Sequence, residues 1–337
     1  MAHYNVTDQR KFGRQEWSTT LLSFGSVALG NMREVVPTAD ARALVHHAWA
    51  AGLRLFDTAP MYGHGLAEYR LGGELMDFER GSYALVTKVG RRLIPARDGS
   101  FDSAPWVHVP PMRMEYDYSY DGVMRQVADS LQRMGTDRFD VLLVHDTDRW
   151  THGPDQPRRF QEALRGAFKA LLALRDEGVV RAIGIGVNEV DVCIDAAEAV
   201  DIDCVLLAGT QTLLNQQASR ELLPLCTSRG IAVLNGRVFG SGILATGTQP
   251  GARFNYAPAA SDVVHKVHAL ENICRSYDVP LGAAALQFAA RHPAVVSVCV
   301  GTRTIAQQER NFMWFEQEIP VDLWDELAAA RLVTASY

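Results

Sequence analysis

The sequence predicts an α/β protein, a closed (β/α)8 TIM barrel with extra helices and long loops at the C-terminal face of the barrel. Eight short apolar segments alternate with segments of helical periodicity along the 337 residues. Strands that are apolar on both faces are typical of a parallel sheet covered by helices. No G-x-G-x-x-G follows the first segment, which favours a closed barrel over the alternative of a Rossmann-like sheet with appended helices.

The predicted strands follow an N-terminal segment around Gly13, which we expect to form a short hairpin or plug. They are short, apolar and bounded by glycine or polar residues. Their ranges are 21–30, 53–57, 82–90, 139–144, 181–187, 204–208, 231–234 and 295–300.

The predicted helices show apolar residues at helical spacing. Pro37 and Thr38 indicate the start of the first helix and Gly52 its end. The ranges are 38–52, 66–76, 124–134, 160–178, 218–229, 262–277, 281–292 and 304–315, of which 160–178 is expected to be the longest. No linker rich in Pro, Gly or Ser divides the chain, so residues 1–337 are expected to form one domain.

Composition and charge restrict the class of protein. The formal net charge of -6 gives no electrostatic reason to expect nucleic acid or an anionic membrane as a partner. The five cysteines are scattered without a C-x2-C pair, so neither a disulfide framework nor a metal site is expected. With no apolar run behind a basic start and none of membrane-spanning length, we expect a cytoplasmic protein that acts on a small molecule. The oligomeric state is left open.

Ionisable side chains stand at the ends of three consecutive predicted strands. The second strand ends at Asp57, the third reaches Lys88 and the fourth is followed by His145. The active site of a TIM barrel lies at these ends. A buried lysine needs an anionic partner, and Asp57 is the candidate for Lys88. Tyr62 lies on the loop that follows Asp57. The four residues together indicate an active site more specifically than any one of them does. Taken singly, Asp57 suits a helix cap, Lys88 a strand-end lysine and His145 a core histidine.

These motifs resemble those of the aldo-keto reductase family. The segments FDTAPMYG, VTK and LLVH match its catalytic tetrad in residue type, spacing and strand order, and the resemblance runs nearly end to end. Within the family, DYSYDGVMRQVADSLQRMG, VHDTDRWTHG and FGSGILATG most resemble bacterial dehydrogenases of free sugars and of pyridoxal. The resemblance implies a barrel enzyme with Tyr62, Asp57, Lys88 and His145 as its catalytic residues.

The implied reaction is hydride transfer to NAD(P) from the anomeric (lactol) carbon of a free aldose such as L-fucose, D-arabinose or L-galactose, giving the lactone. Because a free tyrosine titrates near 10, Lys88 is expected to favour the phenolate of Tyr62, with Asp57 holding the lysine. His145 is expected to hydrogen-bond the substrate oxygen. Oxidation of pyridoxal to its lactone and general aldehyde or ketone reduction are the alternatives.

The resemblance also implies three segments that bind the cofactor. The segment AIGIGVN, with Gly186 and Asn188, holds the carboxamide. The loop 237–242 wraps the pyrophosphate, and the segment 301–311 binds the adenosine phosphate. The residues are Asn188, Gly186, Arg237, Val238, Phe239, Gly240, Ser241, Gly242, Gly301, Thr302, Arg303, Gln307 and Asn311. Gln307 stands where NADP-preferring relatives often carry arginine, so NAD is expected. NADP is the alternative, with Arg303 as acceptor of its 2′-phosphate.

The long connection 91–120 is expected to form much of the substrate pocket, because long loops in compact domains are usually functional. Trp106 and His108 on this connection, and Trp150 after the fourth strand, are the predicted substrate-binding residues. Their rings suit a sugar or a pyridine ring. Tyr118 and Tyr120 are expected to pack the loop against the barrel.

Two hypotheses from other functional classes remain open as alternatives to a dehydrogenase. One is a non-catalytic barrel that binds nicotinamide as a sensor, like the channel-associated β subunits of the same family. The other is a barrel isomerase or aldolase in which Lys88 forms a Schiff base.

Overall fold

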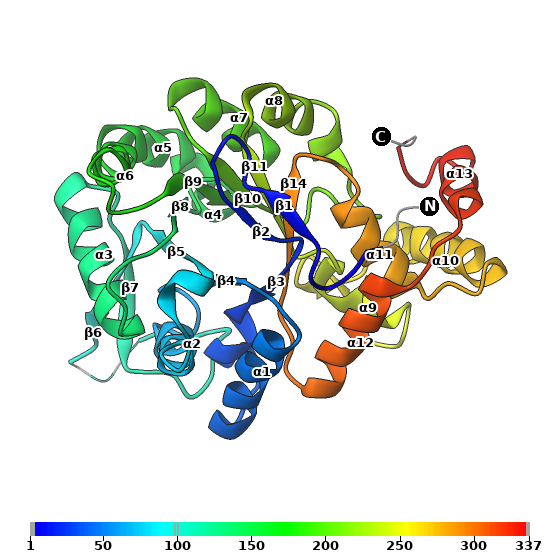
Figure 1. Ribbon diagram of the computed structural model, residues 1–337, viewed down its shortest axis with the longest axis horizontal. Coiled ribbons are helices and arrows are strands. Elements are labelled where there is room, and N and C mark those ends of the chain that lie inside the picture. The colour runs from blue at the N-terminus through cyan, green and yellow to red at the C-terminus, as the bar shows by residue number, and fades with distance from the viewer. Residues whose placement is uncertain (1–3, 98, 100, 335–337) are drawn as a thin grey trace.

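The computed structural model describes residues 4–97, 99 and 101–334. Eight parallel strands close into a barrel in the order β3, β4, β5, β8, β9, β10, β11, β14 (Figure 1). Their bounds are β3 (Leu22–Gly25), β4 (Leu55–Asp57), β5 (Ala84–Val89), β8 (Val141–His145), β9 (Ala182–Val187), β10 (Cys204–Ala208), β11 (Ala232–Gly236) and β14 (Val295–Val300). Each predicted strand coincides with one of these, and the predicted (β/α)8 fold is confirmed.

Helices surround the barrel and cover the outer faces of its strands (Figure 1). They are α1 (Thr38–Ala50), α2 (Leu66–Leu75), α3 (Tyr120–Met134), α4 (Arg149–His152), α5 (Gln156–Arg165), α6 (Ala167–Asp176), α7 (Val190–Ala199), α8 (Leu222–Arg229), α9 (Ile243–Thr246), α10 (Ser261–Ser276), α11 (Leu281–Ala290), α12 (Ile305–Glu316) and α13 (Val321–Ala329). The predicted helices omit α4, α7, α9 and α13.

The first barrel strand is shorter than predicted. It ends at Gly25, and a 3-10 helix, η1 (Ser26–Gly30), follows it. A Cβ atom on Gly30 would lie 2.6 Å from the backbone carbon of Tyr62, so the two chain segments pack backbone against backbone. The strand ends early because the chain after Gly25 packs against the loop that carries Tyr62.

The helix predicted over 160–178 is wrong as a single element. The chain forms α5 and α6 with a break at Gly166, whose φ of -120° and ψ of -73° are not helical. A side chain there would collide with the carbonyl oxygen of Tyr118. The close approach of the loop before α3 therefore breaks the helix, and α10, with 16 residues, is the longest in the described part of the chain.

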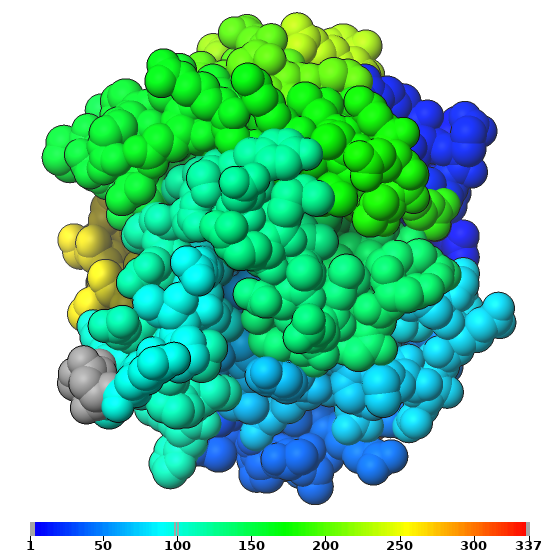
Figure 2. All heavy atoms as spheres, turned by 90° about the vertical axis from the view of Figure 1, so that its left-hand side faces the viewer, coloured from blue at the N-terminus to red at the C-terminus, as the bar shows by residue number. Residues whose placement is uncertain are grey.

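A hairpin closes the N-terminal end of the barrel, as predicted around Gly13. Its strands β1 (Gln9–Lys11) and β2 (Ser18–Thr20) pair antiparallel. The rings of Phe12 and Trp17 stack with centroids 4.2 Å apart, and Phe12 is fully buried. In Figure 2 this dark-blue hairpin lies at the right, whereas the turquoise segment around residue 95 and the yellow segment around residue 250 lie at the left, toward the other end of the barrel.

Two buried carboxylates stabilise the N-terminal end. Asp140, just before β8, accepts hydrogen bonds from the backbone NH of Leu85 at 2.9 Å and from Arg80 at 2.8 Å. Asp203, just before β10, accepts one from the backbone NH of Ile183 at 3.0 Å and pairs with arginines 14 and 175. Acids at this end of a TIM barrel serve stability, because the chemistry takes place at the other end.

All five cysteines are free thiols. Within the described ranges, no helix combines the length and the apolar character that crossing a membrane requires.

Candidate active site

The structure brings Asp57, Lys88, His145 and Tyr62 together at the C-terminal end of the barrel. Asp57 ends β4, Lys88 lies near the end of β5 and His145 ends β8. The Lys88 side chain is only 1% exposed, and its Nζ donates hydrogen bonds to Asp57 Oδ1 at 2.6 Å and to the carbonyl of Thr58 at 2.7 Å. The predicted pairing of Lys88 with Asp57 is therefore present.

The Tyr62 ring lies close to Lys88 and to His145. Lys88 Nζ is 4.8 Å from the ring centroid. The His145 ring stands edge-on to Tyr62, with centroids 6.3 Å apart and an interplanar angle of 85°. The loop is held by the bond from the Tyr62 NH to the Ala59 carbonyl at 3.0 Å and by Gly63, whose φ is +65° and which packs against η1. Glycine is needed at that φ because a side chain would strain the turn.

Burial keeps Tyr62 in its neutral form. The pKa of Tyr62 is raised well above 10, first because the phenol is desolvated and then because Asp57, Cys299 and Asp146 oppose a second negative charge. The expected effect of Lys88 on the phenolate stays a prediction: its Nζ lies 4.8 Å from the Tyr62 ring centroid and is paired with Asp57. Burial likewise raises the pKa of Asp57 above its usual range, against the opposing effect of Lys88.

The surroundings of His145 favour its neutral form. Its pKa lies well below 6.5 because it is buried and because Lys88 and Arg91 repel a further positive charge. Its Nδ1 is buried without a hydrogen-bond partner among the residues the structure describes. Its Nε2 lies 3.5 Å from Asp146 Oδ2. A neutral imidazole offers one NH donor, which suits hydrogen bonding to a substrate oxygen.

The connection 91–120 is more ordered than the predicted loop. It contains an antiparallel pair, β6 (Arg91–Pro95) and β7 (Met112–Tyr116). Arg91 Nη2 lies 2.5 Å from Asp146 Oδ2. Sequence reasoning missed Asp146, although it directly follows His145 in the motif LVHD.

Tyr118 packs the connection against the barrel, as expected. Its hydroxyl lies 2.8 Å from the carbonyl oxygen of His145 and 3.0 Å from that of Asp146. Gly90 makes room for its ring, because a Cβ at Gly90 would collide with it. The same expectation for Tyr120 is wrong, since this side chain begins α3 and is 41% exposed.

The predicted substrate residues differ in their burial and in their neighbours. Trp106 is buried, with its ring centroid 6.1 Å from that of Tyr62. His108 is exposed, and its carbonyl accepts a hydrogen bond from Asn31 at 3.3 Å. Trp150 is 53% exposed, and the guanidinium carbon of Arg237 lies 5.6 Å from the centroid of its ring. Trp106 therefore lies beside Tyr62, and the substrate-binding roles of all three residues stay predictions.

Tyr256 is a second residue that sequence reasoning missed. The Arg237 guanidinium carbon is 5.5 Å from its ring centroid, and its carbonyl accepts a hydrogen bond from Arg33 at 3.3 Å. It lies between β12 (Arg253–Phe254) and β13 (Ala257–Pro258). Its backbone thus joins the loops that follow the first and seventh barrel strands. An aromatic residue within the segment GARFNYAP was the available signal.

The predicted carboxamide residues lie beside the group around Tyr62. Gly186 pairs with His145 in the barrel register, and a Cβ there would lie 3.6 Å from the stem of Lys88. Asn188 donates from its Nδ2 to Asp148 Oδ2 at 2.9 Å, and its backbone NH donates to the same oxygen at 2.7 Å. Asn188 is the donor in both bonds, so its side-chain Oδ1 can accept a hydrogen bond from a ligand.

The loop 237–242 turns sharply, and the NH groups of Gly240 and Gly242 donate to the carbonyls of Arg237 and Phe239 at 3.1 and 3.0 Å. Arg237, Gly240, Ser241 and Gly242 have positive φ angles of 53°, 56°, 64° and 108°. Val238 is buried in the hydrophobic core, and the Phe239 ring packs 6.0 Å from that of Trp314. Successive backbone NH groups in such a loop can bind an anion.

The segment 301–311 surrounds the start of α12. Thr302 Oγ1 is buried without a hydrogen-bond partner in the described part of the chain. Gln307 Oε1 accepts from the backbone NH of Arg303 at 2.9 Å, and Thr304 caps the helix. Gly301 packs on the Gly25 backbone, and Asn311 is buried. The unpaired hydroxyl and the positive helix end suit a phosphate, so these residues fit a dinucleotide.

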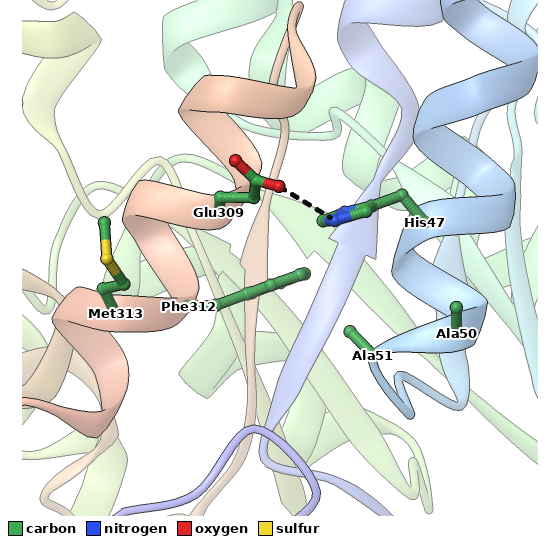
Figure 3. Close-up of a pocket in the computed structure, with 6 residues that line it drawn as sticks. All are labelled: His47, Ala50, Ala51, Glu309, Phe312 and Met313. Carbon is green, nitrogen blue, oxygen red and sulfur yellow. Dashed lines mark ion pairs between the residues drawn. The ribbon is translucent and has the colours of Figure 1, made fainter.

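Two other features lie on the outside of the barrel. Figure 3 shows a groove between α1 and α12, where the His47 ring stacks on Phe312 at 5.6 Å. On the other side of α1, His46 Nε2 lies 3.0 Å from Glu74 and 3.6 Å from Asp77. Arg42 pairs with both of these carboxylates, so a cation already balances their charge.

Known proteins resemble this chain over most of its length. The model of the aldo/keto reductase family matches residues 21–331. Pyridoxal 4-dehydrogenase of Microbacterium luteolum is 40% identical over 98% of this chain and 100% of that protein. D-threo-aldose 1-dehydrogenase of Pseudomonas sp is 39% identical over 93% of this chain and 94% of that protein. Among solved structures, an aldo-keto reductase of Bacillus halodurans in its holo form has the same fold, with a TM-score of 0.74, 24% identity and 98% of each chain covered.

Proposed function

From the premise that this chain belongs to the aldo/keto reductase family of NAD(P)-dependent oxidoreductases, we propose that it oxidises the lactol carbon of a free aldose such as L-fucose, D-arabinose or L-galactose to the lactone. The observation that carries this proposal is the Tyr62 ring, held beside Lys88 and edge-on to His145. The proposal includes one domain over residues 1–337 and a cytoplasmic location, which the free thiols support.

The proposed roles follow from the geometry. Gly186, Asn188 and the loop 237–242 would hold a nicotinamide cofactor, which would supply the hydride acceptor for C1 of the lactol. The phenolate form of Tyr62 takes the proton of the anomeric hydroxyl as the hydride leaves C1, and His145 donates a hydrogen bond to the same oxygen and orients it. The ion pair of Lys88 with Asp57 holds a fixed charge near the Tyr62 ring. This pairing argues against a Schiff-base role for Lys88, because a charged amine is not nucleophilic.

Pyridoxal is the second candidate substrate, and the relative with 40% identity favours it. Its cyclic form is also a lactol, so the same proton and hydride leave the same kind of carbon. Trp106, beside Tyr62, offers a flat surface for either a sugar or a pyridine ring.

An absorbance assay at the NADH band tests the proposal over L-fucose, D-arabinose, L-galactose, L-xylose and pyridoxal. We expect NADH to form with at least one of these lactols and its lactone to appear in equal amount. Consumption of NADH with simple aldehydes or ketones, without oxidation of any lactol, would instead establish a general reductase.

We further propose a preference for NAD, supported by the surroundings of Arg303. Its Nε lies 3.1 Å from Glu34 and its Nη2 donates to the carbonyl of Met32 at 2.9 Å. The residue that could accept a 2′-phosphate is therefore already paired, and Glu34 would repel that phosphate.

Substitution Glu34→Gln is expected to raise the ratio of NADP to NAD efficiency about fivefold, since one exposed charge at about 4 Å contributes about 1 kcal/mol. Both kcat/KM and the Kd of each reduced cofactor, from fluorescence titration, measure the change. Glu16→Gln, on the N-terminal hairpin, is the matched control. An unchanged ratio, or a wild-type preference for NADP, would contradict the assignment.

A further inference from the structure

Asp146 has an unusual backbone conformation directly after His145. Its φ is +51°, a left-handed value that residues other than glycine seldom adopt. Its NH donates to the Gly186 carbonyl at 2.9 Å, and the Tyr118 hydroxyl lies 3.0 Å from its carbonyl oxygen. Such strain persists only where the surrounding structure holds it, and it is common at functional sites.

This conformation places a buried carboxylate among three polar groups. Asp146 Oδ2 is 2.5 Å from Arg91 Nη2 and 3.5 Å from His145 Nε2. Asp146 Oδ1 is 3.5 Å from Asn188 Nδ2. Arg91 itself is largely buried and lies over the Tyr116 ring at 4.8 Å, so the cation that holds the carboxylate is fixed.

The carboxylate distinguishes between the two tautomers of the neutral His145 ring. A proton on Nε2 would point toward Asp146 and be attracted to it. A proton on Nδ1 would be buried without an acceptor among the described residues, and the lone pair on Nε2 would then face the negative charge. Both effects favour the proton on Nε2.

We propose that Asp146 is a positioning residue that keeps the His145 proton on Nε2, with Arg91 holding the carboxylate in place. The inference rests on the proposed function, in which His145 donates that proton in a hydrogen bond to the substrate oxygen. The distance of 3.5 Å between His145 Nε2 and Asp146 Oδ2 is longer than a normal hydrogen bond. The carboxylate therefore attracts the NH proton, but the NH can still donate a hydrogen bond to another acceptor. A substrate oxygen can then take the donor at little cost.

Asp146→Asn tests this role with little change in shape, because asparagine tolerates the left-handed conformation as well as aspartate. In the full-length protein labelled with 15N-histidine, the imidazole shifts report which nitrogen carries the proton. A His145→Gln variant identifies the His145 signals. We expect the Nε2-H tautomer in the wild type and a mixture of both in Asp146→Asn.

The same variant is expected to lower kcat about 10- to 100-fold, with a smaller effect on KM. In a serine protease the corresponding loss of tautomer control lowers kcat about 10⁴-fold, but there the carboxylate makes a direct hydrogen bond. Asp140→Asn is the matched control, since Asp140 is a buried carboxylate at the other end of β8. It should lower the melting temperature and leave kcat and the His145 shifts unchanged.

Three results would overturn the inference: an Nδ1-H tautomer in the wild type, unchanged His145 shifts in Asp146→Asn, or changed shifts with wild-type kcat. The first needs only the wild type and His145→Gln, so it holds even if Asp146→Asn does not fold. If no lactol is oxidised, the proposed function fails, while the tautomer remains measurable in the absence of any activity.

Discussion

Replacement of Tyr62 by Phe is expected to lower turnover about 10²- to 10⁴-fold and to leave cofactor affinity little changed, as for loss of a general acid-base group. The phenol hydroxyl is the only part removed, so the ring still fills the space beside Lys88 and Trp106. Steady-state kinetics with the best lactol and fluorescence titration of NADH measure the two effects.

The pH dependence gives a second measure of the same role. Because the pKa of Tyr62 is raised well above 10, the phenolate fraction is small near neutral pH and grows as the pH rises. Lactol oxidation by the wild type should therefore accelerate toward alkaline pH, and Tyr62→Phe should lose this rise. Tyr69→Phe, an exposed tyrosine on α2, is the control and should behave as the wild type. Near-normal turnover in Tyr62→Phe would refute the assignment.

Replacement of Lys88 by Met is expected to remove most activity and to lower the free energy of unfolding by about 3–5 kcal/mol, as when one partner of a buried ion pair is lost. The methionine fills the space of the lysine stem, but the Asp57 carboxylate, 4% exposed, is left without its cation. Chemical denaturation measures the stability, and the lactol assay measures the activity.

The sign of the pH effect identifies Asp57 as the cause. In Lys88→Met the buried Asp57 holds its proton in the folded state at pH values where the unfolded chain has already lost it. Stability then falls as the pH rises from the usual carboxyl range toward the raised pKa of Asp57. The double variant Asp57→Asn with Lys88→Met should regain most of the lost stability without regaining activity. If the single and double variants are equally unstable, the ion pair is not what Lys88 contributes to folding.

The sequence predicts the barrel and the proximity of Asp57, Lys88 and His145 well, because both depend on local patterns. Each strand is a short apolar run, and Asp57, Lys88 and His145 interrupt this pattern at the ends of three successive strands. Parallel strands bring such ends to one face, so the predicted proximity of these residues follows from the strand order alone. Tyr62 could be included because its loop is short.

The remaining features depend on contacts between distant parts of the chain. The break at Gly166 exists because the backbone at Tyr118 approaches it, and no periodicity in the helix signals this approach. Arg91 and Asp146 are 55 residues apart and meet only in the folded barrel. The exposed positions of His108 and Trp150 likewise depend on how each loop folds back. Residue type alone could propose these rings for the substrate pocket but could not orient them.

The strand β8 carries one buried acid just before its start and the candidate catalytic histidine at its end. Asp140 and His145 are five residues apart, which at the rise of an extended strand is about 17 Å. Evolution or an engineer can therefore alter the loops around His145 to accept a new substrate while the carboxylates at the opposite end continue to hold the barrel together. Changes of specificity and changes of thermal resistance should be separable in this protein.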